Sequence, residues 1–135
     1  MALAQVGGGY QVGDGNVNEI RLGYSAAPQT ATSTATLTAA QILGNVLVAN
    51  PSTSAATYTL PTAAAIDAVL INDKVGSTFD LFIVNIGTSS GTVTLSMGAG
   101  ITDGGNAAVA VATTSSAMFR FRKTGDAAFT VYKIA

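Results

Sequence analysis

The sequence predicts an all-β protein: a single antiparallel β-sandwich or jelly-roll-like domain with one short helix and an extended N-terminal arm. From about residue 34 onward, short apolar or alternating runs recur between stretches rich in Gly, Asn, Pro and Ser. Spacing of about eight to twelve residues between such runs is typical of sandwiches and barrels. Over residues 1–33, by contrast, no period of 2 or 3.6 persists. We therefore expect an arm at 1–33 and a β-sandwich domain at 34–135.

The expected strands follow from their patterns of apolar residues. Residues 79–86 are apolar on both faces, which indicates a central strand buried on both sides. Residues 92–97 and 118–122 alternate between apolar and polar positions, as half-buried strands do. The remaining expected strands are 46–49, 57–60, 107–112 and 129–134. The side chains expected to form the sheet core are Phe79, Leu81, Ile83, Val93, Leu95, Phe119 and Phe121.

The sequence predicts one helix, at about residues 62–71. Pro61 can open it, and Ile66, Val69 and Leu70 fall at positions i, i+3 and i+4, which gives one apolar face. Thr38 and Gln41 have the spacing of a capping box, so we expect a shorter helical turn there that Gly44 closes.

The composition argues against chemistry at a reactive site. The chain has no Cys, no His and no Trp, and only 10% of its residues are charged. His is the side chain whose ordinary pKa suits proton transfer near neutral pH, and Cys is needed for thiolate metal sites. We therefore expect no enzyme activity, no catalytic residue, no cofactor and no metal.

Charge and hydropathy also limit the partners. A net charge of −1 is not the electrostatic signature of a nucleic-acid-binding protein. Four basic residues do gather near the end of the chain, and a solvated or interfacial sheet face explains them better than nucleic-acid contact: Arg120, Arg122, Lys123 and Lys133. No apolar run reaches the length of a membrane span, and the first residues lack the pattern of a signal peptide. We expect neither nucleic acid nor membrane as a partner.

Three motifs have a structural explanation that we prefer to a functional one. Gly7-Gly8-Gly9 lacks the Lys-Ser/Thr that follows a phosphate-binding loop. The segment 103–106 lacks the full calcium-loop pattern, so we interpret it as a turn. Asp80, on a central strand, needs a partner, and Arg120 or Arg122 across the sheet can provide one.

The arm carries the candidate binding residues. Its apolar side chains are too many for an inert linker and too scattered for an independent core. Such a segment can place single side chains into pockets of a partner, although it could also wrap around its own domain. The candidate partner-binding residues are Leu3, Val6, Tyr10, Val12, Ile20, Leu22 and Tyr24.

Several stretches carry a resemblance to a known family. They are residues 59–69, 75–85 and 119–126, a final Val131-Tyr132-Lys133, and residues 10–16 in the arm. Together they resemble small head decoration (cement) proteins of tailed bacteriophages, notably marine and cyanobacterial ones. The resemblance covers roughly residues 34–135 and contains no catalytic residue.

This resemblance implies a compact β domain, a homotrimer, made in the host cytoplasm and seated on the outer capsid surface of the virion. The major capsid protein would be its partner, and its role would be to clamp neighbouring capsid subunits. Another virion surface β module, such as a fibre or a carbohydrate-binding tip, is the alternative. An enzyme is a third reading, which would rest on carboxylate chemistry alone.

Overall fold

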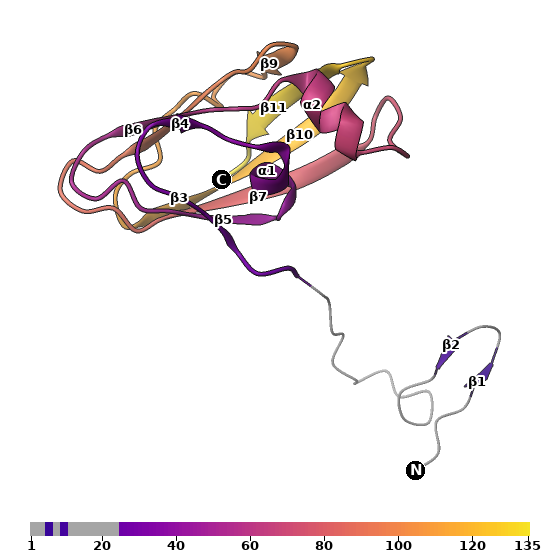
Figure 1. Ribbon diagram of the computed structural model, residues 1–135, viewed down its shortest axis with the longest axis horizontal. Helices are drawn as coiled ribbons and strands as arrows, with labels where there is room; N and C mark the ends of the chain where they lie inside the picture. Colours follow the sequence, from indigo (N-terminus) through magenta and orange to yellow (C-terminus); the bar gives the residue numbers. More distant parts are fainter. Residues whose placement is uncertain (1–4, 7–8, 11–24) are drawn as a thin grey trace.

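The computed structural model describes residues 5–6, 9–10 and 25–135, and this part of the chain is mostly β (Figure 1). A six-stranded sheet has the order β3-β5-β7-β10-β11-β9, and a three-stranded sheet has the order β4-β6-β8. The strands of the larger sheet are β3 (Gln29–Ala31), β5 (Val46–Ala49), β7 (Thr78–Asn85), β9 (Ile101–Asp103), β10 (Ser115–Gly125) and β11 (Ala128–Lys133). Those of the smaller sheet are β4 (Ala35–Thr36), β6 (Ala56–Thr59) and β8 (Val93–Ser96). In addition, β1 (Gln5–Val6) pairs antiparallel with β2 (Gly9–Tyr10).

From β3 to β8 the chain alternates between the two sheets. Odd-numbered strands belong to the larger sheet and even-numbered strands to the smaller one. A chain that crosses to the second sheet and back returns to the first sheet in its original direction. Accordingly, β3, β5 and β7 pair in parallel, and so do β4, β6 and β8. This part of the fold is a coil of three two-stranded turns.

The end of the chain closes the larger sheet differently. β10 pairs antiparallel with β7, and β11 pairs antiparallel with β10 as a hairpin, while β9 pairs in parallel with β11. The expectation of a mostly β fold is confirmed, but the prediction of an antiparallel sandwich is wrong for the coiled part. That prediction assumed that consecutive strands pair with each other, whereas here most consecutive strands lie in different sheets.

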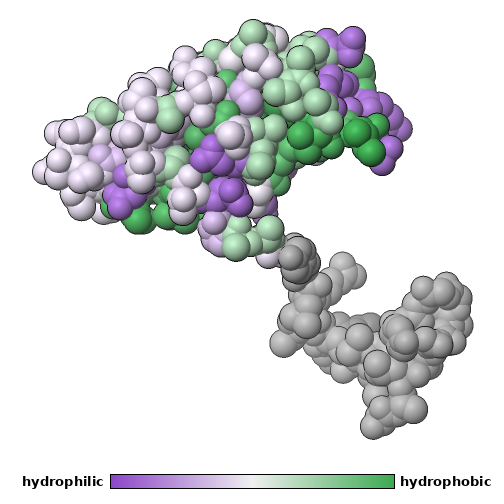
Figure 2. Space-filling view, in the orientation of Figure 1, coloured by the Kyte–Doolittle hydropathy of each residue, from purple (hydrophilic) through white to green (hydrophobic). Residues whose placement is uncertain are grey.

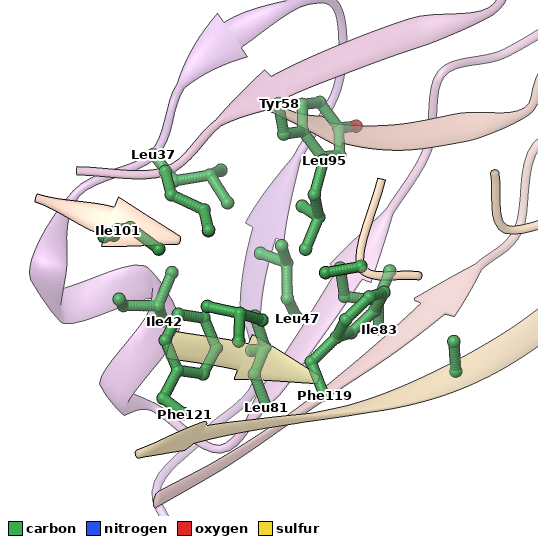
Figure 3. Close-up of a cluster of buried hydrophobic side chains, with 14 of the residues drawn as sticks. Leu37, Ile42, Leu47, Tyr58, Leu81, Ile83, Leu95, Ile101, Phe119 and Phe121 are labelled. Carbon is green, nitrogen blue, oxygen red and sulfur yellow. The ribbon is translucent and has the colours of Figure 1, made fainter. Parts of the chain in front are cut away.

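The two sheets share one core. Their inward side chains, together with those of the two helices, form a single apolar cluster (Figure 3). Tyr58 and Leu95 reach into it from the smaller sheet, and Ile83 and Phe119 from the larger one. Every expected core residue is buried except Phe79, which is half-buried and stacks on Phe121 with ring centroids 4.6 Å apart. The predicted inward faces of β7, β8 and β10 are therefore confirmed, whereas the expected burial of residues 79–86 on both sides is wrong.

Two helices occupy the returns from the smaller to the larger sheet. α1 (Ala39–Leu43) has the complete capping box between Thr38 and Gln41. α2 (Ala63–Val69) begins at Thr62, whose hydroxyl oxygen accepts a hydrogen bond from the Ala65 N–H at 3.2 Å. Ile42 and Ile66 turn into the core from these helices. Both helix predictions are confirmed, although α2 is shorter than expected.

Three segments differ from the strand predictions. Residues 107–112 form only an isolated bridge, between Val111 and Val93. β9, at Ile101–Asp103, lies outside the expected strands. Residues 29–31, expected within the arm, form the edge strand β3 and pair with β5. All three segments are short and lie at sheet edges, where single-strand patterns are weakest.

Phe119→Ala or Phe121→Ala should lower the free energy of unfolding by about 3–5 kcal/mol, because each fully buried ring would leave a cavity. Chemical unfolding measures this loss. The matched control is Phe82→Ala on β7, which should cost substantially less because 38% of Phe82 is exposed. Equal losses at the inward and outward positions would contradict this assignment of faces.

Candidate partner-binding surface

Part of the outward surface of the larger sheet is apolar and open. It comprises the apolar side chains that point away from the core on β5, β7 and β10 and in the segments after β7 and β11, and we call it the outer face: Val46, Val48, Phe82, Val84, Ile86, Met118 and Ile134. Phe82, Ile86 and Ile134 are exposed, the last two to about half of their surface. No other layer of the described chain covers it. Apolar surface of this kind commonly marks an interaction site.

Strand register brings these side chains into rows. Val46 lies opposite Phe82, and Phe82 lies opposite Met118. Val48 lies opposite Val84 in the next row. Side chains at directly opposite positions of neighbouring strands contact one another, so the rows form one continuous surface.

Two adjacent shallow hollows lie on this face. One, of about 310 Å³, is lined by Phe82, Val84, Ser116, Ala117, Met118 and Ala135. The other, of about 380 Å³, is lined by Val84, Asn85, Ile86, Thr114, Ser115 and Ser116. Val84 and Ser116 are common to both, so the hollows adjoin. Pockets of this shape can accept apolar side chains of a partner.

An ion pair borders the apolar rows. Arg120 donates to both carboxylate oxygens of Asp80, from Nε at 2.7 Å and from a terminal guanidinium nitrogen at 3.0 Å. The hydrogen bond from Arg120 lowers the pKa of Asp80, and the same bond raises the pKa of Arg120. The sequence-based expectation that Asp80 pairs across the sheet is confirmed. Because the pair is partly exposed, it adds little stability and serves chiefly as a polar border.

The remaining surface is mostly polar but weakly charged. Figure 2 shows pale atoms over much of the molecule, with strongly hydrophobic atoms gathered at its lower edge and at the end that carries α2. At that end Val69, Ile71 and Val75 are exposed. Such a surface favours contacts that depend on apolar area and shape more than on charge.

The described residues contain no group of three or more His, Cys, Asp or Glu side chains placed to hold a metal ion. Asp103, at the segment interpreted as a turn, uses both carboxylate oxygens on backbone groups. Oδ1 accepts from the N–H groups of Gly105 and Ala107, and Oδ2 from that of Ala108. These bonds, led by the one from Ala107, lower the pKa of Asp103. The turn interpretation is confirmed.

None of the helices in the described part of the chain is long and apolar enough to span a membrane.

Most of the candidate binding residues in the arm lie outside the described residues: Leu3, Val12, Ile20, Leu22 and Tyr24. Val6 and Tyr10 belong to β1 and β2, whose backbones pair as Val6 with Gly9 and Gln5 with Tyr10. Their role in binding stays a prediction.

Sequence reasoning missed the outer face, although its signal was present. The apolar character of both faces of residues 79–86 was interpreted as burial on both sides. β7 is indeed central in its sheet, but only one of its faces is covered. A second covering layer would have required more helices than the sequence predicts, and this was the available clue.

The chain matches no protein-family model, no curated protein and no solved structure. The function proposed below therefore depends on the surface just described and on the residues that carry the resemblance.

Asp103→Asn should destabilise the protein at pH 7, because the amide offers one acceptor oxygen where the carboxylate offers two. The folded-state pKa of Asp103 lies below its unfolded value of about 3.9, so its contribution is present above that pH and is lost as the pH falls through the folded-state value. Chemical unfolding at pH 7 and below about pH 3 should show the difference from wild type shrinking in acid. The control is Asp126→Asn, at an exposed carboxylate of the β10–β11 turn. A loss from Asp103→Asn that does not depend on pH would contradict this account.

Proposed function

We propose that this chain is a virion structural protein, a capsid decoration (cement) protein that binds the outer surface of an icosahedral phage head. It would stabilise contacts between major capsid subunits and catalyse no reaction. The observation that carries the proposal is the open apolar outer face on a two-sheet scaffold whose described residues hold no metal-binding cluster. The resemblance of residues 59–69, 75–85 and 119–126 to such proteins supports it.

A passive clamp needs a rigid body and an adhesive surface. Rigidity comes from the single core shared by both sheets and both helices. The outer face supplies apolar area, and association with a capsid subunit would remove Phe82, Ile86 and Ile134 from water. Burial of apolar side chains in well-packed pockets supplies most of the binding energy of protein interfaces.

Assembly into a homotrimer and attachment through the arm would strengthen a weak single contact. Several linked contacts raise the apparent affinity without any new chemistry. An extended arm can also add a strand to the edge of a neighbouring sheet through main-chain hydrogen bonds. Trimer formation and arm attachment belong to the proposal together with the capsid partner.

Titrating the protein onto phage heads assembled without it should raise the temperature at which DNA is released, until the sites are filled. The reason is mass action, since a ligand that binds only the intact head stabilises that state. Fluorescence of a DNA dye during heating measures the release. Binding should persist in about 0.5 M NaCl, because the surface offers few charges to screen. A release temperature that does not change on saturation would contradict the clamp.

A gel of purified particles separates the proposal from the fibre or carbohydrate-binding alternative. A decoration protein should be present in amounts comparable to the major capsid protein, whereas a fibre should be present in few copies. A low copy number would favour the alternative, for which exposed Phe82 and Tyr132 would be the aromatic contacts.

Phe82→Glu should reduce binding to heads at least tenfold, since it places an uncompensated charge in the centre of the contact, a cost of about 1.4 kcal/mol or more. The matched control is Val109→Glu, which adds the same charge at an exposed apolar position in the loop between β9 and β10. Co-sedimentation with heads measures binding, and circular dichroism checks the fold. Equal binding by the two folded variants would exclude the outer face as the contact.

A further inference from the structure

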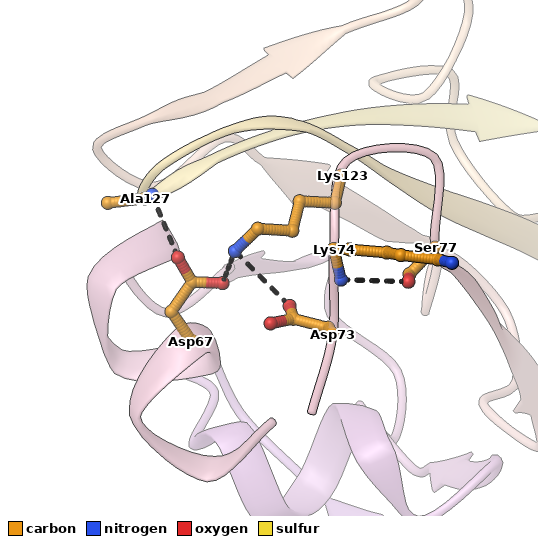
Figure 4. A network of polar contacts seen from close by, with 6 residues as sticks. All are labelled: Asp67, Asp73, Lys74, Ser77, Lys123 and Ala127. Atoms are coloured by element: carbon orange, nitrogen blue, oxygen red, sulfur yellow. Dashed lines mark hydrogen bonds and ion pairs between the residues drawn. The ribbon is translucent and has the colours of Figure 1, made fainter. Parts of the chain in front are cut away.

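A lysine occupies the last inward position of β10. The inward row of this strand runs through Ala117, Phe119 and Phe121 and ends at Lys123, which is only 8% exposed. Its Nζ contacts Oδ1 of Asp67 on α2 and lies 3.3 Å from Oδ2 of Asp73 in the loop after α2 (Figure 4). One amine is thus held between two carboxyl groups at the edge of the core.

The two oxygens of Asp67 are held differently. Oδ2 accepts a hydrogen bond from the backbone N–H of Ala127 at 2.8 Å, while Oδ1 faces the lysine. The carboxyl group of Asp73 contacts the same Nζ, so the two carboxyl groups meet at one amine. The backbone N–H polarises one C–O bond of Asp67 and leaves the other oxygen beside two groups that can exchange protons with it.

The cluster is sheltered from water. Side-chain exposure is 10% for Lys123, 17% for Asp67 and 12% for Asp73. The ring of Phe129, itself buried, lies with its centroid 5.4 Å from Nζ. Oδ2 of Asp73 is buried, and its contact among the described residues is the ion pair with Nζ of Lys123, which lacks the geometry of a hydrogen bond. Water stabilises a separate ammonium and carboxylate more than a neutral amine and a neutral acid. Because little water reaches this cluster, the free-energy difference between the charged and the neutral pair is smaller than it would be in solution.

At rest the pair is ionised. The hydrogen bond between them raises the pKa of Lys123 and lowers the pKa of Asp67. The ammonium nevertheless contacts two carboxyl groups, those of Asp67 and Asp73. It can therefore pass a proton to one of them while the amine stays in contact with the other. A neutral amine is a nucleophile, and here it is already held against the carboxyl group that it would attack. Fixing two reacting groups in contact is among the largest known contributions to reaction rate.

We propose that Lys123 and Asp67 join covalently through an amide between Nζ and Cγ, with Asp73 as the group that moves the proton. The ammonium of Lys123 gives a proton to Asp73, Asp73 passes it to Oδ1 of Asp67, and the free amine attacks Cγ of the resulting neutral acid. The N–C bond forms, and Oδ2 carries the developing negative charge against the Ala127 N–H. The nitrogen of the adduct then gives a proton, through Asp73, to the Oδ1 hydroxyl, and the C–Oδ1 bond breaks with release of water. The sum is ammonium plus carboxylate giving amide plus one water, with no oxidant or other reactant.

The bond would tie α2 to β10 across 56 residues of sequence. It would close the return between β6 and β7 onto the last hairpin of the larger sheet. A cross-link that spans so much chain restricts the unfolded state and resists stepwise unfolding. This inference goes beyond the proposed function and does not depend on it, because the cluster lies on the inner side of the sheet.

The test is mass spectrometry of the full-length chain, denatured after incubation at neutral pH. We expect a mass lower than that of the sequence by one water. Digestion with trypsin should then give a branched fragment in which residues 22–74 are joined to residues 123–133, since a modified Lys123 is no longer cleaved. A chain with its full sequence mass would overturn the proposal. Loss of water without the branched fragment would also overturn it, because cyclisation at Asp14-Gly15 or Asp103-Gly104 gives the same mass.

Two variants test the roles of the residues. Lys123→Arg keeps the positive charge but has no nucleophilic amine, so it should retain the full sequence mass. Asp73→Asn keeps the volume but cannot relay a proton, so most of the chain should remain unlinked after the time in which wild type is linked. The control is Lys74→Arg, at the exposed neighbour of Asp73, which should link as wild type does. A branched fragment at the wild-type level in Asp73→Asn would remove Asp73 from the mechanism.

Discussion

The structure depends on one constraint: β5 and β7 of the larger sheet and β6 and β8 of the smaller sheet must each bury one apolar face in the core between the sheets. Because successive strands from β3 to β8 lie in different sheets, both sheets depend on the core packed between them. The cluster that joins Leu47 and Ile83 to Tyr58 and Leu95 is therefore the condition for both. Parallel pairing follows from this alternation. The returns from β4 to β5 and from β6 to β7 each carry a short helix that places an isoleucine in the core, Ile42 or Ile66.

Polar groups at the rim of the core hold loops in one conformation where apolar packing does not. Asn85 is buried at the end of β7, where its side-chain amide donates to the carbonyls of Gly91, Val111 and Ala112, and its oxygen accepts from Gly87 N–H. This one side chain connects the β7–β8 turn to the segment before β10. The cluster around Lys123 does the same at the opposite end of β7, where it holds α2 and the following loop. A buried polar group is costly unless satisfied, so such groups select one arrangement of the surrounding loops.

The inner and outer sides of the larger sheet differ in burial: the inner side is packed in the core, and the outer side is partly exposed. The inner side forms the core, and the outer face leaves apolar area exposed, with the Asp80–Arg120 pair as its polar border. A substitution on one side should have little effect on the other, because alternate residues of a strand point to opposite faces. This separation allows a small domain to remain firmly folded while its exposed surface is adapted to a partner.

The sequence by itself determined the β class, the inward residues of β7, β8 and β10, both helices, the N-cap of α1, and the pairing of Asp80. These follow from local period, capping geometry and charge, which are properties of neighbouring residues. Only the tertiary structure decided strand direction, the exposure of Phe82 and Val84, and the contact of Lys123 with Asp67 and Asp73. The physical reason is that a strand's alternation states which side chains share a face but not which strand lies beside it or what covers that face. Contacts across 56 residues are set by how the two sheets pack, which no local pattern records.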